Sequence, residues 1–365
     1  MSMTVYEKIN IALGGWVITK VAMVDRYHYL VISQWNNDDN KNPYINKKDG
    51  KKYDHPTRML SIDVKNNKLD WMTSYSGYSY GYCDGGHIGG NMEAFFGSGN
   101  GITYHLDYGK DTFKHEALLA TAERIKKGIA IGANAIRLIG RHFYMGDGAN
   151  EIWRRDTPKE WTLISQEPNA YWKRFGKGDI ASLDGFSEEE IYFSGDEGNL
   201  WALVKKEWHK ISTNPKWQID NVICAEDGKV YAVDTRGGIA VGREEMFQIV
   251  HQADEEALPY LDEVCYFQGK LYGGGAGSPL YVFDEKKGWV YANLPLIGSV
   301  ESLCAKDGIM LIAGAWTLKV YNGKETIELY GGERELNELL LKGFMQSATE
   351  VLDNADKLLD GMKEK

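Results

Sequence analysis

An internal repeat of about 40 residues constrains the fold of this chain more than any other feature. The repeat is clearest in segments 221–231, 262–272 and 301–311, where an apolar strand, a turn with Gly at one fixed place and a second apolar strand follow one another. Anchor residues of the second strand recur at intervals of 48, 39, 41 and 39 residues, at Tyr144, Tyr192, Tyr231, Tyr272 and Leu311. The chain is therefore built from copies of one supersecondary unit.

Two further series indicate that each unit holds four strands. A third strand is visible at 199–204 and 280–284. An outermost strand is marked by an aromatic or apolar residue followed three positions later by an aliphatic one, at Trp161 and Ile164, Trp208 and Ile211, Met246 and Ile249, and Thr326 and Leu329, with Trp289 in the remaining copy. Four short strands in about 40 residues predict a blade of an all-β propeller, because one blade cannot cover both of its own apolar faces.

The predicted propeller domain covers residues 1–332. Its blades are clear from about residue 129, and two divergent blades fill 17–128. Seven is the favoured number of blades, with six and eight as alternatives. Segment 114–127 is compatible with an outer strand or a short helical insertion, and segment 4–11 with a strand that closes the last blade. The clear blades are predicted at 129–166, 178–214, 219–251, 261–293 and 299–330.

The Gly-containing turns, the Tyr of the second strand and the Trp of the outer strand resemble the β-propeller superfamily of WD-repeat, Kelch and quinoprotein-like domains. The resemblance covers roughly residues 17–330. The sequence lacks the paired Trp-Asp with upstream Gly-His, the Kelch double glycine and the regular quinoprotein tryptophan pattern. The resemblance therefore implies a fold and transfers no functional residue.

Residues 333–365 form a separate C-terminal unit in the sequence pattern. Apolar residues step by three or four positions, which predicts an amphipathic helix of roughly 40 Å over 336–362. We expect its apolar stripe to cover the propeller itself, with dimerisation or insertion into a partner's groove as alternatives. The stripe comprises Leu336, Leu340, Phe344, Ala348, Val351, Ala355, Leu358 and Met362.

Composition limits the classes of partner. The 365 residues carry a formal net charge of −10 and no basic stripe, which disfavours nucleic acid and anionic lipid. We find no secretory signal and no apolar run long enough to span a membrane, so we expect a cytoplasmic protein. None of the four cysteines forms a close pair, and we expect all of them to be buried and reduced: Cys83, Cys224, Cys265 and Cys304.

Two glycine clusters, 97–101 and 273–277, invite a nucleotide-loop interpretation. A phosphate-binding loop is followed by a helix N-terminus, whereas each of these clusters precedes a predicted strand. We therefore interpret them as turns between the second and third strands of a blade. The eight histidines are scattered, without the close spacing of a metal site.

One candidate site consists of polar residues where the innermost strands begin. These positions surround one mouth of the central channel, and their oxygen atoms are suited to Ca²⁺, as in lactonase-like propellers. The alternative is structural, because Asp and Asn are favoured where a loop enters a strand. The residues are Asn134, Asn221, Asp262 and Glu301 in equivalent positions, with Asp179 one place away.

A second candidate site is rich in tyrosine. Aromatic side chains interleaved with Ser and Gly are typical of protein-binding surfaces, although strand residues inside a blade are the alternative. The polar insertion 36–55, which contains Asp38 and Asp39, is close in the chain and is expected to contribute to the same surface. The aromatic residues are Trp71, Tyr75, Tyr78, Tyr80 and Tyr82.

These patterns favour a non-enzymatic protein that binds another, basic protein and needs no cofactor. We nominate no catalytic residue, because no nucleophile motif, metal-ligand spacing or acid/base pair is present. Among binding roles, a bacterial toxin-neutralising immunity protein is the leading hypothesis. A calcium-dependent lactonase-like hydrolase and a scaffold subunit of a larger assembly are the alternatives.

Overall fold

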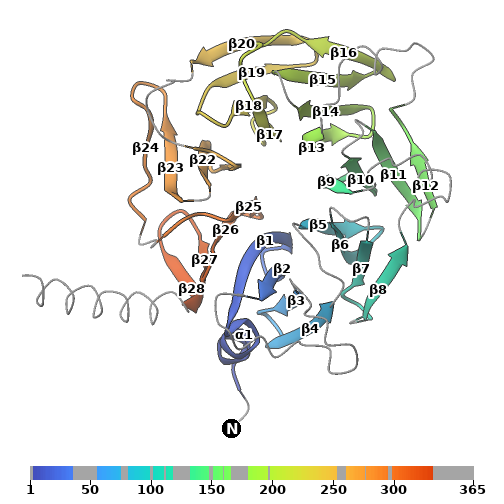
Figure 1. Ribbon diagram of the computed structural model, residues 1–365, viewed down its shortest axis with the longest axis vertical. Coiled ribbons are helices and arrows are strands. Elements are labelled where there is room, and N and C mark those ends of the chain that lie inside the picture. Colours follow the sequence, from blue (N-terminus) through green and yellow to red (C-terminus); the bar gives the residue numbers. More distant parts are fainter. Residues whose placement is uncertain are drawn as a thin grey trace, which may run out of the picture.

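The described strands form seven antiparallel four-stranded sheets, which stand around a central channel as the blades of a β-propeller (Figure 1). The seven-blade prediction is therefore confirmed, and the chain is an all-β member of the fold that the repeat predicted. In every sheet the four strands follow one another in sequence, so no strand is exchanged between blades.

This computed structural model describes residues 3–35, 56–74, 81–98, 102–110, 112–117, 132–147, 151–158, 160–165, 180–195, 198–252, 260–275, 277–294 and 298–331. Several predicted features lie outside these residues: Asp38 and Asp39 with the insertion 36–55, Tyr75, Tyr78, Tyr80, Asp179 and the C-terminal helix of 333–365.

The first blade comprises β1 (Trp16–Asp25), β2 (His28–Trp35), β3 (Thr57–Asp63) and β4 (Lys68–Ser74). The second comprises β5 (Gly81–Ile88), β6 (Asn91–Ser98), β7 (Ile102–Asp107) and β8 (Thr112–Ala117). The third comprises β9 (Ala133–Ile139), β10 (His142–Asp147), β11 (Ile152–Thr157) and β12 (Glu160–Leu163). Strand β8 decides the ambiguity of segment 114–127 in favour of an outer strand as far as Ala117.

The fourth blade comprises β13 (Ile180–Ser187), β14 (Glu190–Gly195), β15 (Asn199–Val204) and β16 (Glu207–Ile211). The fifth comprises β17 (Ile219–Cys224), β18 (Val230–Asp234), β19 (Ile239–Arg243) and β20 (Met246–His251). The sixth comprises β21 (Glu263–Phe267), β22 (Lys270–Gly275), β23 (Ser278–Asp284) and β24 (Gly288–Tyr291). The seventh comprises β25 (Ser302–Lys306), β26 (Ile309–Gly314), β27 (Thr317–Tyr321) and β28 (Thr326–Gly331).

The two faces of the propeller differ in how they connect strands. At one face, the turn face, each innermost strand ends in a short turn to the second strand. Gly269 and Gly308 occupy such turns with φ of 82° and 75°, a conformation that side chains with a Cβ rarely adopt. At the opposite face, the loop face, the innermost strands begin and the connections between blades run. The fixed Gly of the repeat is thus a requirement of the turn face.

The glycines near the end of the second strand are required for a different reason from the glycines of the turns. A Cβ added to Gly97 would lie 2.8 Å from Ile136 Cδ1, and one added to Gly146 would lie 2.5 Å from Ile180 Cγ2. In both cases the crowding atom belongs to the innermost strand of the next blade. Glycine is therefore needed where the second strand passes close to the neighbouring blade, and the nucleotide-loop interpretation is excluded at 273–277, where strand β23 follows.

The apolar core is divided into seven clusters among the described residues, each shared by two neighbouring blades. In the cluster between the fourth and fifth blades, for example, Tyr192 and Leu200 pack with Val222 and Val230. This arrangement is the physical reason for the repeat, because each blade covers its neighbour's apolar face.

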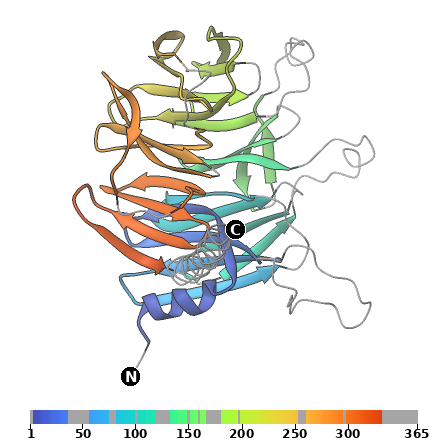
Figure 2. The same cartoon turned by 60° about the vertical axis from the view of Figure 1, so that its left-hand side comes forward.

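Helix α1 (Val5–Leu13) closes the ring on its outside, against β28 and β4 (Figure 2). The closing strand proposed for segment 4–11 is therefore wrong. Thr4 and Glu7 form a capping box that starts a helix. Val5, Ile9, Ala12 and Leu13 then lie on one helical face and join the buried cluster between the seventh and first blades. Within the described residues, no helix is long and apolar enough to cross a membrane.

Candidate functional site

The central channel contains a cavity of about 430 Å³ that lies towards the loop face. Its walls are the first residues of the innermost strands, and all seven blades contribute to them. The lining includes five carboxylate side chains and two cationic ones. The carboxylates belong to Asp84, Asp220, Asp262, Glu263 and Glu301, and the cations are Lys20 and Arg137.

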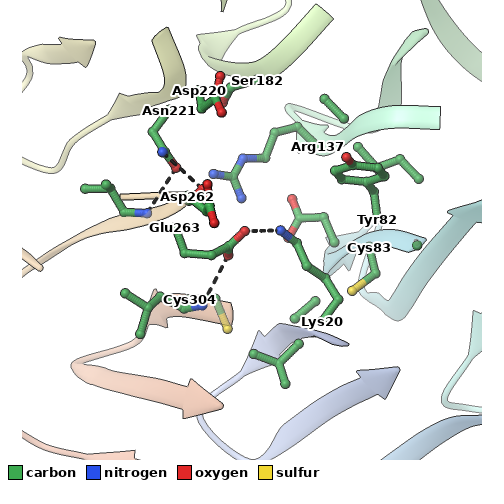
Figure 3. Close-up of a pocket in the computed structure, with 18 of the residues that line it drawn as sticks. Lys20, Tyr82, Cys83, Arg137, Ser182, Asp220, Asn221, Asp262, Glu263 and Cys304 are labelled. Atoms are coloured by element: carbon green, nitrogen blue, oxygen red, sulfur yellow. Dashed lines mark hydrogen bonds and ion pairs between the residues drawn. The ribbon is translucent and has the colours of Figure 1, made fainter. Parts of the chain in front are cut away.

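Lys20 and Glu263 form an ion pair across the channel, from the first blade to the sixth (Figure 3). Both side chains are largely shielded from solvent. Burial alone disfavours the ammonium form, but the adjacent Glu263 carboxylate raises the pKa of Lys20 above its ordinary value. The Lys20 ammonium also lies 5.4 Å from the ring centre of Tyr82. Lys20 is therefore held as a cation in the channel wall.

Arg137, on β9 of the third blade, supplies the second cation in the channel (Figure 3). Its Nε lies 3.5 Å from Oδ1 of Asp184 on the next blade. Burial raises the pKa of the Asp184 carboxyl, and the guanidinium of Arg137 opposes that effect. Each of the two cations that line the channel thus lies next to a carboxylate, Lys20 beside Glu263 and Arg137 beside Asp184.

Three further carboxylates, those of Asp220, Asp262 and Glu301, lie close to the start of their innermost strands at the loop face. Asp220 accepts a hydrogen bond from Gln218 Nε2 at 3.3 Å, and Glu301 accepts one from Ser299 Oγ at 2.9 Å. Tyr260 lies near them, and the charge of Asp262 raises its pKa. These three side chains give the channel an acidic mouth, a name used below for Asp220, Asp262 and Glu301.

Several polar residues of the innermost strands connect one blade to the next. Each accepts a hydrogen bond from a backbone N–H of the following blade, which would otherwise be buried without a partner. Asn221 Oδ1 accepts from Val264 N at 3.0 Å, and Asn221 Nδ2 donates to Asp262 O at 3.2 Å. The same role is filled by Asp84 towards Leu138, Ser182 towards Val222, Asp184 towards Cys224, Glu263 towards Leu303 and Ser302 towards Val21.

The structure brings together the predicted calcium ligands Asn134, Asn221, Asp262 and Glu301 in the lining of the cavity. Asn221 is occupied by its bonds to the next blade, and Lys20 and Arg137 add positive charge to the same cavity. Within the described part of the chain, no three His, Cys, Asp or Glu side chains are grouped as metal ligands. This donor set does not fit Ca²⁺ well, and the calcium alternative stays a prediction.

The two described members of the predicted aromatic surface lie apart. Trp71 is exposed on β4, the outermost strand of the first blade, whereas Tyr82 lines the channel on β5, the innermost strand of the second. The segments 36–55 and 75–80 lie between β2 and β3 and between β4 and β5. The flanking strand ends belong to the loop face, which is also the face of the acidic mouth. The predicted binding role of these residues stays a prediction.

All four cysteines are free and lie on innermost strands that line the channel. Burial raises the pKa of each thiol, to about 12 for Cys265. Protonated, shielded thiols are poor nucleophiles, so they serve as small apolar residues of the repeat. Cys83 and Cys265 are buried, as predicted, whereas Cys224 and Cys304 are only half-buried.

Sequence reasoning missed Lys20, Arg137 and Glu263, three charged residues of the cavity lining. For Glu263 the sequence does contain a signal that points to the channel. Glu263 follows the predicted ligand Asp262 directly, as Ser302 follows Glu301 in the next repeat. For Lys20 the first blade diverges too far for alignment. A charged residue in the middle of an otherwise apolar innermost strand is the general signal that points to the channel.

Comparison with known proteins finds sequence similarity over part of the chain. No family model matches the chain. The immune protein Tsi7 of Pseudomonas aeruginosa is 27% identical over 178 residues, which cover 46% of this chain and 57% of Tsi7. The chain thus matches little more than half the length of that relative.

Solved structures are similar in fold. YCF48, in a structure with D1 peptide, gives a TM-score of 0.55 at 14% identity over 82% of this chain and 91% of its own. The WD40 propeller domain of Doa1 has a TM-score of 0.51 at 9% identity, over 82% of this chain and 90% of the Doa1 chain. The designed Ika8 protein gives 0.52 at 11% identity over 86% of each chain. By fold, this chain is a β-propeller.

Proposed function

We propose that this propeller is a toxin-neutralising immunity protein that binds one basic protein at its loop face. The observation that carries the proposal is the acidic mouth of Asp220, Asp262 and Glu301 around a cavity of about 430 Å³. The five carboxylates of the cavity lining outnumber its two cations, so the lining carries an excess of negative charge. A Lys or Arg side chain of a partner is the group that such a mouth would accept.

The net charge of −10 supports the same kind of partner. A field of one sign speeds the association of a protein of opposite sign and makes the rate depend on ionic strength. An immunity protein gains from fast association, because the toxin must be captured before it acts.

The position of the predicted recognition segments also supports the loop face. The strands that flank segments 36–55 and 75–80 end or begin at that face. We propose that these segments, with Asp38, Asp39 and Tyr78, contribute to the binding surface there. Long connections that depart from a repeat are where repeat proteins carry their binding residues.

Similarity to the immune protein Tsi7 supports the class of function. The similarity extends over part of each chain. The basic character of the partner is therefore proposed from the charge of this propeller and the shape of its cavity.

The test is co-expression with the product of the gene next to its own, which for an immunity protein encodes the toxin. We expect the propeller to restore growth and to form a complex with one copy of each protein. Asp220→Asn, Asp262→Asn and Glu301→Gln combined should slow association at least about tenfold at low salt and reduce its salt dependence.

The matched control carries the same loss of three charges at the turn face, by Glu226→Gln, Glu244→Gln and Asp307→Asn, which are all exposed. We expect this control to bind with nearly the rate of the unmodified protein. Equal effects of the two triple variants, or several partners instead of one, would count against the proposal and favour a scaffold.

A further inference from the structure

A groove of about 710 Å³ lies between the fifth and sixth blades, on the outside of the propeller and away from the channel. Its floor is apolar, with Val241 and Phe283 from the facing blades and the stacked rings of Tyr231 and Tyr266, whose centres are 5.4 Å apart. Met246, on the outermost strand β20, is 82% exposed at its edge. An apolar surface of this kind usually has an occupant.

The equivalent place between the seventh and first blades has an occupant. There helix α1 lies against the outermost strands β28 and β4, and its Val5, Ile9 and Leu13 are buried in the cluster that the two blades share. The fold therefore accepts an amphipathic helix in the outer wedge between blades. The groove between the fifth and sixth blades is the same kind of wedge, lined by β20 on one side and by residues of the sixth blade on the other.

The chain has 34 residues beyond Gly331, where β28 ends, and their sequence has the required pattern. Apolar residues recur every three or four positions from Leu336 to Met362, so a helix over this segment would span roughly 40 Å. Because packed sheets lie about 10 Å apart, this length exceeds the spacing from one blade to the next.

Charge is consistent with this occupant. Segment 333–365 contains eight carboxylates and five cations. The charged side chains that line the groove are three cations, Lys229, Arg243 and Lys270, and one carboxylate, Glu285. Arg243 pairs with Glu190 at 2.8 Å and Lys229 with Asp227 at 3.6 Å, so part of this positive charge is already paired within the propeller. A basic toxin is a poorer match for this groove than for the acidic mouth.

We propose that the C-terminal segment 336–362 of this chain docks its apolar stripe in the groove between the fifth and sixth blades of the same molecule. The segment plays the part there that α1 plays between the seventh and first blades. This inference is independent of the proposed function, because the groove opens on the outside of the ring.

Hydrogen exchange followed by mass spectrometry on the full chain tests the proposal. We expect backbone amides of 336–362 to exchange at least about tenfold more slowly than those of an unstructured peptide. Met246→Glu combined with Val250→Glu places two charges on the groove side of β20 and should abolish this protection. Phe344→Asp combined with Val351→Asp should in turn speed exchange in β20.

The matched control is Ile249→Glu, on the same strand but outside the lining of the groove. This control should leave the protection of 336–362 unchanged. Light scattering should show a monomer with protection independent of protein concentration.

Unprotected amides in 336–362 of the unmodified chain would overturn the proposal, as would equal effects of the groove variant and the control. A dimer whose protection grows with concentration would overturn it in favour of a second copy. If the groove variant weakens toxin binding and leaves the exchange of 336–362 unchanged, the groove belongs to the partner.

Discussion

Lys20 and Glu263 form an ion pair inside the channel, although 243 residues separate them in the sequence. The pair joins the first blade to the sixth, and Glu263 also accepts hydrogen bonds from Ser302 and Leu303 of the seventh. A small group of side chains thus links three blades on either side of the point where the ring closes.

Removing one member of this pair should destabilise the protein. Lys20→Met leaves the carboxylate of Glu263 shielded and without its cation, which should lower the free energy of unfolding by about 2–3 kcal/mol. Lys20→Met combined with Glu263→Gln should recover part of that loss. Urea denaturation measures both, and Lys110→Met, in an exposed pair with Asp107, should change stability by less than about 1 kcal/mol.

Asn221 should matter more than an ordinary asparagine, because its amide joins the fifth blade to the sixth through Val264 and Asp262. Asn221→Ala leaves buried backbone groups without partners and should cost about 1–3 kcal/mol. Asn91→Ala, at an exposed position, is the control. Equal unfolding midpoints of the two variants would show that the link between blades contributes nothing.

Helix α1 should contribute to stability through its buried face. Ile9 is fully buried and Ile11 is 66% exposed on the same helix, so both substitutions by Ala change helix propensity alike. We expect Ile9→Ala to lower the free energy of unfolding by about 2–4 kcal/mol and Ile11→Ala to have little effect. Thermal melting separates the two, and similar losses would mean that α1 does not close the ring.

Stability should fall in acid. Burial works against ionisation of Asp25, but hydrogen bonds from the backbone N–H of Tyr27 and from His28 lower the pKa of Asp25 below its ordinary value. A lowered folded pKa stabilises the protein above the unfolded pKa of about 3.9, and that contribution is lost as the pH falls further. Asp25→Asn should therefore reduce the loss of stability between about pH 5 and pH 2. An unchanged pH profile would contradict this assignment.

Calcium should leave thermal stability unchanged, because Lys20 and Arg137 already place positive charge in the cavity and Asn221 bonds to the next blade. The melting temperature is measured with calcium and with a chelator. A large stabilisation by calcium that disappears in Asp262→Ala and Glu301→Ala would favour the hydrolase alternative.

The blades were predictable from sequence because their signals are local. The interval of 39 residues between Tyr192 and Tyr231 is the length of one blade. The Gly of each turn and the Trp of the outer strand are features of a single blade. The repeat assigns equivalent positions to Asn134, Asn221, Asp262 and Glu301, and all four line the cavity of the channel. The N-terminal segment was misassigned because α1 lies outside the repeat, and its capping box at Thr4 and Glu7 was the signal that was overlooked.

The amino-acid sequence by itself determined the kind of blade and favoured seven of them, because a blade is held together by neighbours in the chain. The tertiary structure alone decided which charges meet in the channel. Lys20 and Glu263 become partners when the ring closes, and no spacing in the chain encodes that meeting. The arrangement of the blades also separates Trp71, on an outermost strand, from Tyr82, on an innermost strand that lines the channel. The order of a strand within its blade sets the distance of its side chains from the axis.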